Sequence, residues 1–437
     1  MTFSVDVMQQ HFGANDQDGQ TGFVVDVPKQ RQILLDRSSP LHQRFRALFC
    51  LRALGGEHAE AVDAICAAFD VESNGPRPST DTVAMDTSAT EASAMDTQAT
   101  EASATGTTST DTLSTDTPAL DTPASGSAQT DSEEGSALLK HELAYVLGQM
   151  RSRLAIDKLS QVLADENENA MVRHEAGEAL GAIGGESVLP ILMSYSKHPV
   201  DVIRETCELA VAKILMEQTE EGSSSSTTAA DYCSAGCCGQ EVSKENGCSV
   251  SVQVNECCTT STDSCCSTDS KPSVSAAATI VNADISFDSE DPAPALKQRL
   301  SIPQLQAMLM NQELPLFERY RAMFSLRNRA SKDAVLALCT GLKEPKSALF
   351  RHEIAYVLGQ LQHPASVPAL LEALAREDDV DMVRHECAEA LGSIASPEAM
   401  QALENYQRNV KTPRVVRESC DVALDMAAYE NSTELHF

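Results

Sequence analysis

The stretch ALLKHELAYVLGQM at residues 137–150 returns almost unchanged as ALFRHEIAYVLGQL at residues 348–361. A related stretch follows each copy, MVRHEAGEALG at residues 171–181 and MVRHECAEALG at residues 382–392. All four stretches carry a His-Glu pair, and the copies are offset by 211 residues at both pairs (352 − 141 and 385 − 174). This constant offset predicts a chain built from two related halves.

Each half is itself repetitive, because its two His-Glu pairs lie 33 residues apart (174 − 141 and 385 − 352) and apolar residues recur at helical spacing around them. A period near this length with paired helices is typical of HEAT-type solenoids. Ser136 and Ser347 stand where helix N-caps are expected. Aligning the units places a basic residue at one position in all of them: Arg44, Lys140, Arg173 and Arg204, then Arg319, Arg351, Arg384 and Arg417. We therefore predict an all-α fold, an α-solenoid of eight HEAT-like helical hairpins in two pseudo-symmetric halves of four.

Two low-complexity stretches interrupt the helical pattern. Residues 72–135 include the tandem AMDTSATEAS and AMDTQATEAS, which cannot bury enough apolar surface to offset chain entropy, so we expect a disordered insertion. Residues 218–293 form a Cys/Ser/Thr-rich linker with eight cysteines between Cys233 and Cys266. The predicted organisation is an N-terminal tail at 1–27, an N-terminal half at 28–217 that contains the insertion, the linker, and a C-terminal half at 294–430.

Charge and composition narrow the possible partners and the compartment. The net charge of −31 argues against nucleic acid and favours a cationic substrate or a basic protein. We expect no membrane span and no secretory signal, hence a cytoplasmic protein. The vicinal cysteines of the linker could bind a soft metal or sense redox state, but no paired C-x-x-C motif occurs there, and disorder in a reducing compartment is the preferred interpretation.

The basic residue occurs in every unit and is expected to be architectural, for example by bonding helix ends between neighbouring repeats. The His-Glu pair, in contrast, occurs only in the two inner units of each half. The outer units carry Phe45-Arg46, Glu205-Thr206, Tyr320-Arg321 and Glu418-Ser419 at that position. Adjacent helices of a solenoid pack about 8–10 Å apart, so two such pairs can share one ion. Two histidines with a carboxylate are typical of non-haem iron, although zinc accepts the same ligands.

These motifs closely resemble deoxyhypusine hydroxylase, a family of HEAT-repeat di-iron monooxygenases, over about residues 40–70, 137–217 and 296–429. The resemblance implies O2-dependent hydroxylation of the deoxyhypusine side chain of translation initiation factor 5A by a monomeric chain with two Fe(2+) ions. It assigns one iron to His141, His174 and Glu175, and the other to His352, His385 and Glu386. Glu142 and Glu353 lie beside the metals, either as further ligands or as catalytic residues that bind the substrate amines.

The alternative is a non-catalytic HEAT-repeat scaffold or a metal-binding interaction protein, which would not require the four inner positions to share one residue pair. Tyr145 and Tyr356 lie four residues after the first histidine of each half and either shape a pocket or pack in the core. Met171 and Met382 either touch the substrate channel or pack. His198 and His363 each precede a proline at a repeat turn and are expected to be solvated.

Overall fold

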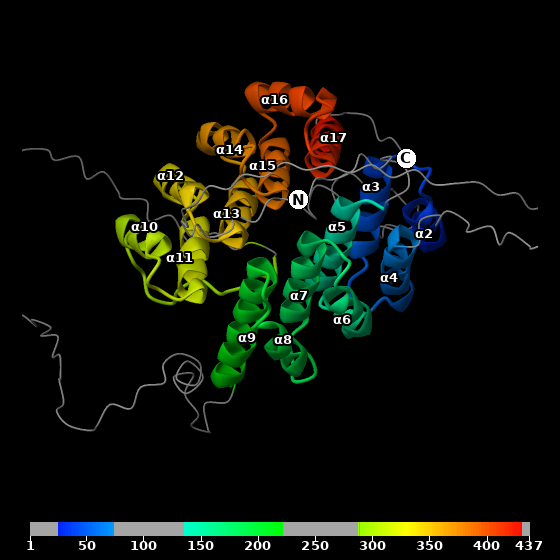
Figure 1. Cartoon of the computed structure of the whole chain (residues 1–437), viewed down its shortest axis with the longest axis horizontal. Helices are drawn as coiled ribbons and strands as arrows, with labels where there is room; N and C mark the ends of the chain where they lie inside the picture. Colours follow the sequence, from blue (N-terminus) through cyan, green and yellow to red (C-terminus); the bar gives the residue numbers. More distant parts are fainter. Residues whose placement is uncertain (1–24, 74–134, 222–286, 288, 431–437) are drawn as a thin grey trace, which may run out of the picture.

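The computed structural model describes residues 25–73, 135–221, 287 and 289–430 of the 437-residue chain. The predicted insertion, the cysteine cluster, most of the linker and nearly all of the N-terminal tail therefore lie outside the described residues. Every regular element in the described ranges is a helix, and the all-α prediction is confirmed (Figure 1). None of the described helices has the length and apolar character needed to cross a bilayer.

The described α-helices follow one another as pairs whose two members contact each other. In the first half they are α2 (Val27–Leu35), α3 (Leu41–Arg52), α4 (Ala59–Ser73), α5 (Ala137–Gln149), α6 (Ile156–Ala164), α7 (Ala170–Ile183), α8 (Leu189–Tyr195) and α9 (Asp201–Glu221). In the second half they are α10 (Ile302–Met310), α11 (Leu316–Arg329), α12 (Lys332–Cys339), α13 (Ala348–Leu361), α14 (Val367–Leu374), α15 (Asp381–Ile394), α16 (Pro397–Arg408) and α17 (Arg414–Glu430). Short 3₁₀ helices precede α6 (η1, Arg153–Ala155), follow α12 (η3, Thr340–Lys343) and precede α14 (η4, Pro364–Ser366).

The second helix of each pair, which we call an inner helix, contacts the inner helices of the neighbouring pairs. The inner helices α3, α5, α7 and α9 pack in that order, and so do α11, α13, α15 and α17. In addition, α9 contacts α11 and α13, while α17 contacts α3 and α5. The inner helices therefore close into a ring with two seams between the halves, and Figure 1 shows α10–α17 lying against α2–α9.

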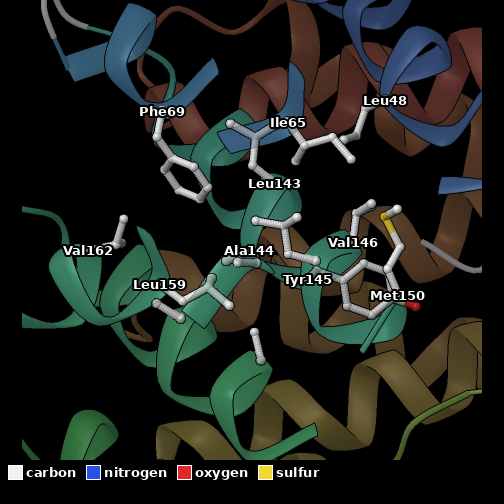
Figure 2. Close-up of a cluster of buried hydrophobic side chains, with 14 of the residues drawn as sticks. Leu48, Ile65, Phe69, Leu143, Ala144, Tyr145, Val146, Met150, Leu159 and Val162 are labelled. Carbon is white, nitrogen blue, oxygen red and sulfur yellow. The ribbon is translucent and has the colours of Figure 1, made fainter. Parts of the chain in front are cut away.

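Each half has its own hydrophobic core, but the last inner helix of each half also reaches the other core. Val422 and Met426 of α17 belong to the core of the first half, and Leu209 of α9 belongs to that of the second. Figure 2 shows Leu143 of α5 in one cluster with Leu48 of α3 and Ile65 of α4. Full burial of a leucine contributes about 1.5–3 kcal/mol, so this packing fixes where α5 lies.

Four of the eight recurring basic residues join the two helices of a hairpin. The Nε atoms of Arg44, Arg173, Arg319 and Arg384 donate to the carbonyl oxygens of the residues ten positions earlier, at 2.9, 2.9, 2.9 and 3.0 Å. These carbonyls belong to the last turn of the preceding helix, where intrahelical donors are lacking. The bonds agree with an architectural role. The expected bonds between neighbouring repeats also occur, since Lys140 Nζ donates to Glu168 at 2.7 Å and Arg351 Nε donates to Asp379 at 3.0 Å.

The two predicted N-caps are present and also bridge the seams. Ser136 Oγ accepts from the Leu139 amide and Ser347 Oγ from the Phe350 amide, both at 3.0 Å. The same hydroxyls donate to the other half, Ser136 to Glu418 at 2.8 Å and Ser347 to Glu205 at 2.6 Å. The starts of α5 and α13, and hence the histidines one turn later, are fixed from both sides.

Candidate metal centre

Four histidines, one from each of the inner helices α5, α7, α13 and α15, meet at the centre of the ring. The ring centroids of His141 and His174 lie 5.4 Å apart, and so do those of His352 and His385. Across the halves, His141 lies 5.1 Å from His385 and 5.7 Å from His352, and His174 lies 5.4 Å from His352. All four side chains are at most 5% exposed. The imidazoles of the two halves therefore form one buried cluster.

Small residues allow the helices that carry these histidines to approach closely. A Cβ atom added to Gly148 of α5 would lie 2.8 Å from the Ala179 Cα of α7. In the second half, a Cβ atom on Gly359 of α13 would lie 3.1 Å from the Ala390 Cα of α15. Each glycine follows its histidine by seven residues (148 − 141 and 359 − 352), and this identical spacing brings the imidazoles together in the same way twice.

Carboxylates accompany the imidazoles in a symmetric pattern. His141 Nε2 lies 3.3 Å from Glu175 Oε2, and His352 Nε2 lies 3.4 Å from Glu386 Oε2. The first histidine of each half thus faces the glutamate of the second pair. Glu142 and Glu353 are also buried, at 1% and 3% exposure.

Many polar atoms of this cluster make no regular hydrogen bond within the described structure. They are both ring nitrogens of His141, His174 and His352, together with His385 Nε2, Glu142 Oε2 and Glu353 Oε1. Leaving a buried polar group unsatisfied costs about 1–3 kcal/mol, so a concentration of such groups in one place favours an external partner. Imidazole nitrogens and carboxylate oxygens are ligands of transition-metal ions, and the donor set fits a divalent metal.

Three sets of ligand atoms lie within 4.8 Å of one another. They are His352–His385–Glu386, His141–His174–His352 and His174–Glu175–Glu178. The first set coincides with the ligands expected for the second iron. The ligands expected for the first iron, His141, His174 and Glu175, are divided between the other two sets.

A cavity adjoins the cluster. It is lined by His141, Glu142, Tyr145, Gln149, Glu175, Glu178, Glu290, Pro292, His352, Glu353, Tyr356 and Glu386. Six of these residues are glutamates, and no lysine or arginine is among the described lining residues. Its volume of about 20 Å³ is on the order of what one or two waters occupy by this measure.

Comparison with known proteins identifies the family. A model of HEAT repeats matches residues 132–212, 302–381 and 335–424. Deoxyhypusine hydroxylase from Danio rerio is 39% identical over 417 residues, which cover 94% of this chain and 95% of that protein. This chain belongs to the deoxyhypusine hydroxylase family. The resemblance inferred from the sequence is confirmed, and so is the expectation of an enzyme rather than a non-catalytic scaffold.

Two further relatives of the deoxyhypusine hydroxylase family support the assignment. The protein of that name from Mus musculus is 43% identical over 70% of this chain and 81% of its own length. The solved structure of human deoxyhypusine hydroxylase in complex with glycerol matches with a TM-score of 0.61 and 38% identity. That match covers 92% of this chain and 96% of the human chain.

Two acidic residues that the sequence did not single out, Glu178 and Glu389, also lie beside the histidine cluster. Glu389 Oε1 lies 3.4 Å from His385 Nδ1, and Glu178 is the equivalent residue 211 positions earlier. Each follows the second histidine of its half by four residues, which places both on one helix face. The repeated EALG at 178–181 and 389–392 was the available signal. A carboxylate on the second nitrogen of a ligating histidine fixes its tautomer and orientation.

The electrostatics of the cluster also favour a bound cation. Burial and the charges of the three neighbouring imidazoles hold the pKa of His174 well below its ordinary value. Burial, reinforced by the carboxylates of Glu178 and Asp291, raises the pKa of Glu353 well above its ordinary value. A divalent ion relieves both effects, because it binds neutral imidazoles and offsets crowded negative charge.

The remaining sequence candidates lie apart from the cluster, with one exception. Tyr145 and Tyr356 line the cavity and also pack against the cores. Met171 and Met382 are buried but are not among the described lining residues of the cavity. His198 and His363 lie in partly exposed turns, where their Nδ1 atoms accept from backbone amides at 3.1 and 3.0 Å.

Proposed function

We propose that this chain is a deoxyhypusine hydroxylase that uses O2 and two Fe(2+) ions to hydroxylate the deoxyhypusine side chain of translation initiation factor 5A. The named relatives support the reaction. The observation that carries the proposal is the convergence of four buried imidazoles, seven of whose eight ring nitrogens make no regular hydrogen bond within the described residues. We further propose that it acts in the cytoplasm as a monomer.

In this proposal, His141, His174 and Glu175 hold one iron, and His352, His385 and Glu386 hold the other. The closeness of the imidazoles across the halves supports a dinuclear centre. Ferrous ions with two histidines and one carboxylate supply dioxygen activation for C–H hydroxylation. The protein excludes bulk water, because every one of these side chains is at most 5% exposed, and Glu389 orients His385.

Glu142 and Glu353 are proposed to bind the substrate. Deoxyhypusine is a cationic side chain with amine groups, and each of these glutamates keeps one buried oxygen without a regular hydrogen bond to the described residues. Those oxygens, Glu142 Oε2 and Glu353 Oε1, can accept from the substrate ammonium groups. The six glutamates of the cavity wall and the net charge of −31 attract such a substrate over longer distances.

The test combines metal analysis with product analysis. Purified protein reconstituted without oxygen is expected to hold about two irons per chain and, with oxygen, to add one oxygen atom to deoxyhypusine-containing factor 5A. His174→Ala or Glu386→Ala should lose about half of the iron and reduce activity by at least 10²-fold, whereas His363→Ala should change neither. A protein that binds no iron, or one whose His174→Ala variant stays fully active, contradicts the proposal.

A further inference from the structure

Two tyrosine hydroxyls face each other across the pseudo-symmetric halves. Tyr145 of α5 and Tyr356 of α13 are equivalent residues, 211 positions apart, and their hydroxyl oxygens lie 3.0 Å from each other. Both residues line the cavity beside the histidine cluster, and Tyr145 is 8% exposed. A glutamine follows each tyrosine by four residues, Gln149 and Gln360.

Residues 289–292, which we call the strap, break this symmetry. The strap belongs to the segment assigned from the sequence to the linker, yet it contacts both halves. Asp291 accepts two hydrogen bonds from Arg327, at 2.7 and 2.6 Å, which fixes the strap to α11. On the other side, the Glu290 amide donates to Gln149 Oε1 at 2.9 Å, and Gln149 Nε2 donates to the Glu290 carbonyl at 3.3 Å.

As a consequence, only one of the two glutamines donates a hydrogen bond to its tyrosine within the described structure. Gln360 Nε2 donates to the Tyr356 hydroxyl at 3.0 Å and also to Ser289 Oγ of the strap at 3.2 Å, while Gln360 Oε1 accepts from Arg327 at 2.9 Å. Gln149 is occupied by the strap, and its hydrogen bonds within the described structure go to Glu290 rather than to Tyr145. Arg327 and Gln360 therefore orient one tyrosine, and the strap withholds the equivalent bond from the other.

Because of this asymmetry, the tyrosine pair has one more donor proton than it has acceptors among the described residues. The two hydroxyls carry two protons, and one of these protons is donated in the hydrogen bond between them. In the bond from Gln360 the donated proton belongs to the glutamine amide, so neither phenolic proton is involved. One phenolic O–H therefore has no acceptor among the described residues and lies in the wall of the cavity. Burial raises the pKa of both tyrosines, so both hydroxyls keep their protons at neutral pH.

The size of the cavity indicates what this donor meets. The space of about 20 Å³ is on the order of what one or two waters occupy by this measure. A hydrogen-bond donor needs an acceptor, and ammonium groups are not acceptors. We propose that the Tyr145–Tyr356 pair donates one hydrogen bond to the oxygen atom that the reaction handles, either dioxygen or the new hydroxyl oxygen of the product. This inference rests on the proposed function.

The first arm of the test measures affinities of the iron-loaded full-length chain without oxygen. Factor 5A carrying hypusine and factor 5A carrying deoxyhypusine differ by the one hydroxyl, so the ratio of their Kd values measures the contribution of its hydrogen bond. If the pair binds the product hydroxyl, the wild type should prefer the hydroxylated protein by about three- to tenfold, the worth of one buried hydrogen bond. Tyr145→Phe/Tyr356→Phe should remove that preference. Tyr320→Phe is the matched control, since it deletes a buried hydroxyl that does not line the cavity.

The second arm uses nitric oxide as a diatomic stand-in for dioxygen on the same iron-loaded protein. If the pair binds the diatomic, the N–O stretching frequency of the wild type should shift on exchange into D2O, and the double variant should lose that shift while Tyr320→Phe keeps it. If the double variant loses only the Kd preference, the pair binds the product hydroxyl. If it loses only the D2O shift, the pair binds dioxygen.

The two arms also separate failure of this inference from failure of the proposed function. Wild type that binds neither form of factor 5A contradicts the proposed substrate, and the nitric oxide arm then still tests the tyrosine pair. Equal Kd values together with no D2O shift in the wild type overturn the inference without any variant. The inference is also overturned if the folded double variant keeps both signals.

Discussion

Glu389 illustrates how single residues outside the expected ligand set shape the centre. Its carboxylate is buried, lies 3.4 Å from His385 Nδ1 and also accepts from Ser419 Oγ at 3.4 Å. His385 Nε2, on the other side of the ring, makes no regular hydrogen bond to the described residues. An anionic partner on Nδ1 makes that second nitrogen a better metal ligand.

Glu389→Gln should lower iron affinity by about 10- to 100-fold, because the amide keeps the shape but removes the negative charge behind His385. Anaerobic titration with ferrous ion, followed by metal analysis after gel filtration, measures the change. Glu398→Gln, on the exposed start of α16, is the control and should bind iron as the wild type does. Unchanged affinity in Glu389→Gln would mean that this carboxylate serves packing alone.

The negative charge of the half-buried Glu205 carboxylate destabilises the folded state. Burial raises the pKa of its carboxyl, even though the carboxylate accepts from Ser347 Oγ at 2.6 Å. A raised pKa in the folded state means that folding takes up protons, so stability is greatest below the ordinary pKa and falls as the pH rises through the raised one.

Glu205→Gln should therefore raise the Tm by about 2–4 °C at pH 7.5 and have a smaller effect at pH 4. The glutamine keeps an acceptor for Ser347 while removing the buried charge. Thermal unfolding at the two pH values tests this, with the exposed Glu57→Gln as control. A variant that is less stable at pH 7.5 would show that the charge of Glu205 strengthens the seam.

At the scale of elements, the decisive contact is the close packing of successive inner helices at small residues. Gly148 meets the backbone of Ala179, and the equivalent Gly359 meets that of Ala390. The sequence contained these glycines in both LGQ motifs, but it did not indicate what they face, because the contact joins different repeats. The helix periods and N-cap serines, in contrast, were predictable since they depend on residues a few positions apart.

Gly148→Ala should destabilise the protein by about 1–3 kcal/mol, because its methyl group would lie 2.8 Å from the Ala179 Cα and push α5 from α7. It should also reduce the iron content, since His141 and His174 lie on these two helices. Gly177→Ala is the matched control: its methyl group would meet only ordinary contacts at 3.4 Å, so the gain in helix propensity of about 1 kcal/mol should dominate. Chemical unfolding and iron analysis of both variants provide the measurement, and equal stability would refute the tight-contact account.

At the scale of the whole molecule, closure of the ring explains why two solenoid halves make one site. Ser136 and Glu418 bond across one seam although 282 residues separate them, and Glu205 and Ser347 bond across the other. The duplicated His-Glu pairs predicted that equivalent residues exist in each half. They could not predict the strap, because its sequence resembles the rest of the linker and its role depends on Arg327 and Gln149, which lie in different halves.

Because the proposed ligands from both halves share one cluster, removing the proposed metal should loosen the seams. Chelation is expected to lower the Tm by several degrees, since free iron at 100 times its Kd stabilises the folded state by about 2.7 kcal/mol per site. It should also increase the hydrodynamic radius, and adding iron back should reverse both changes. Sedimentation velocity on loaded, stripped and reloaded protein provides the measurement, and an identical sedimentation coefficient in all three states would contradict this coupling.

The two seams have a further consequence for how such a chain arises. Each consists of the last inner helix of one half inserted against the opening helices of the other, so the same patch is used twice in a reciprocal manner. This is the isologous arrangement of a two-fold homodimer. A half-length polypeptide could build the whole ring by pairing with its twin, and fusion of two gene copies makes that encounter intramolecular. In the single chain only one junction connects the halves, and the strap at that junction gives two equivalent tyrosines different neighbours.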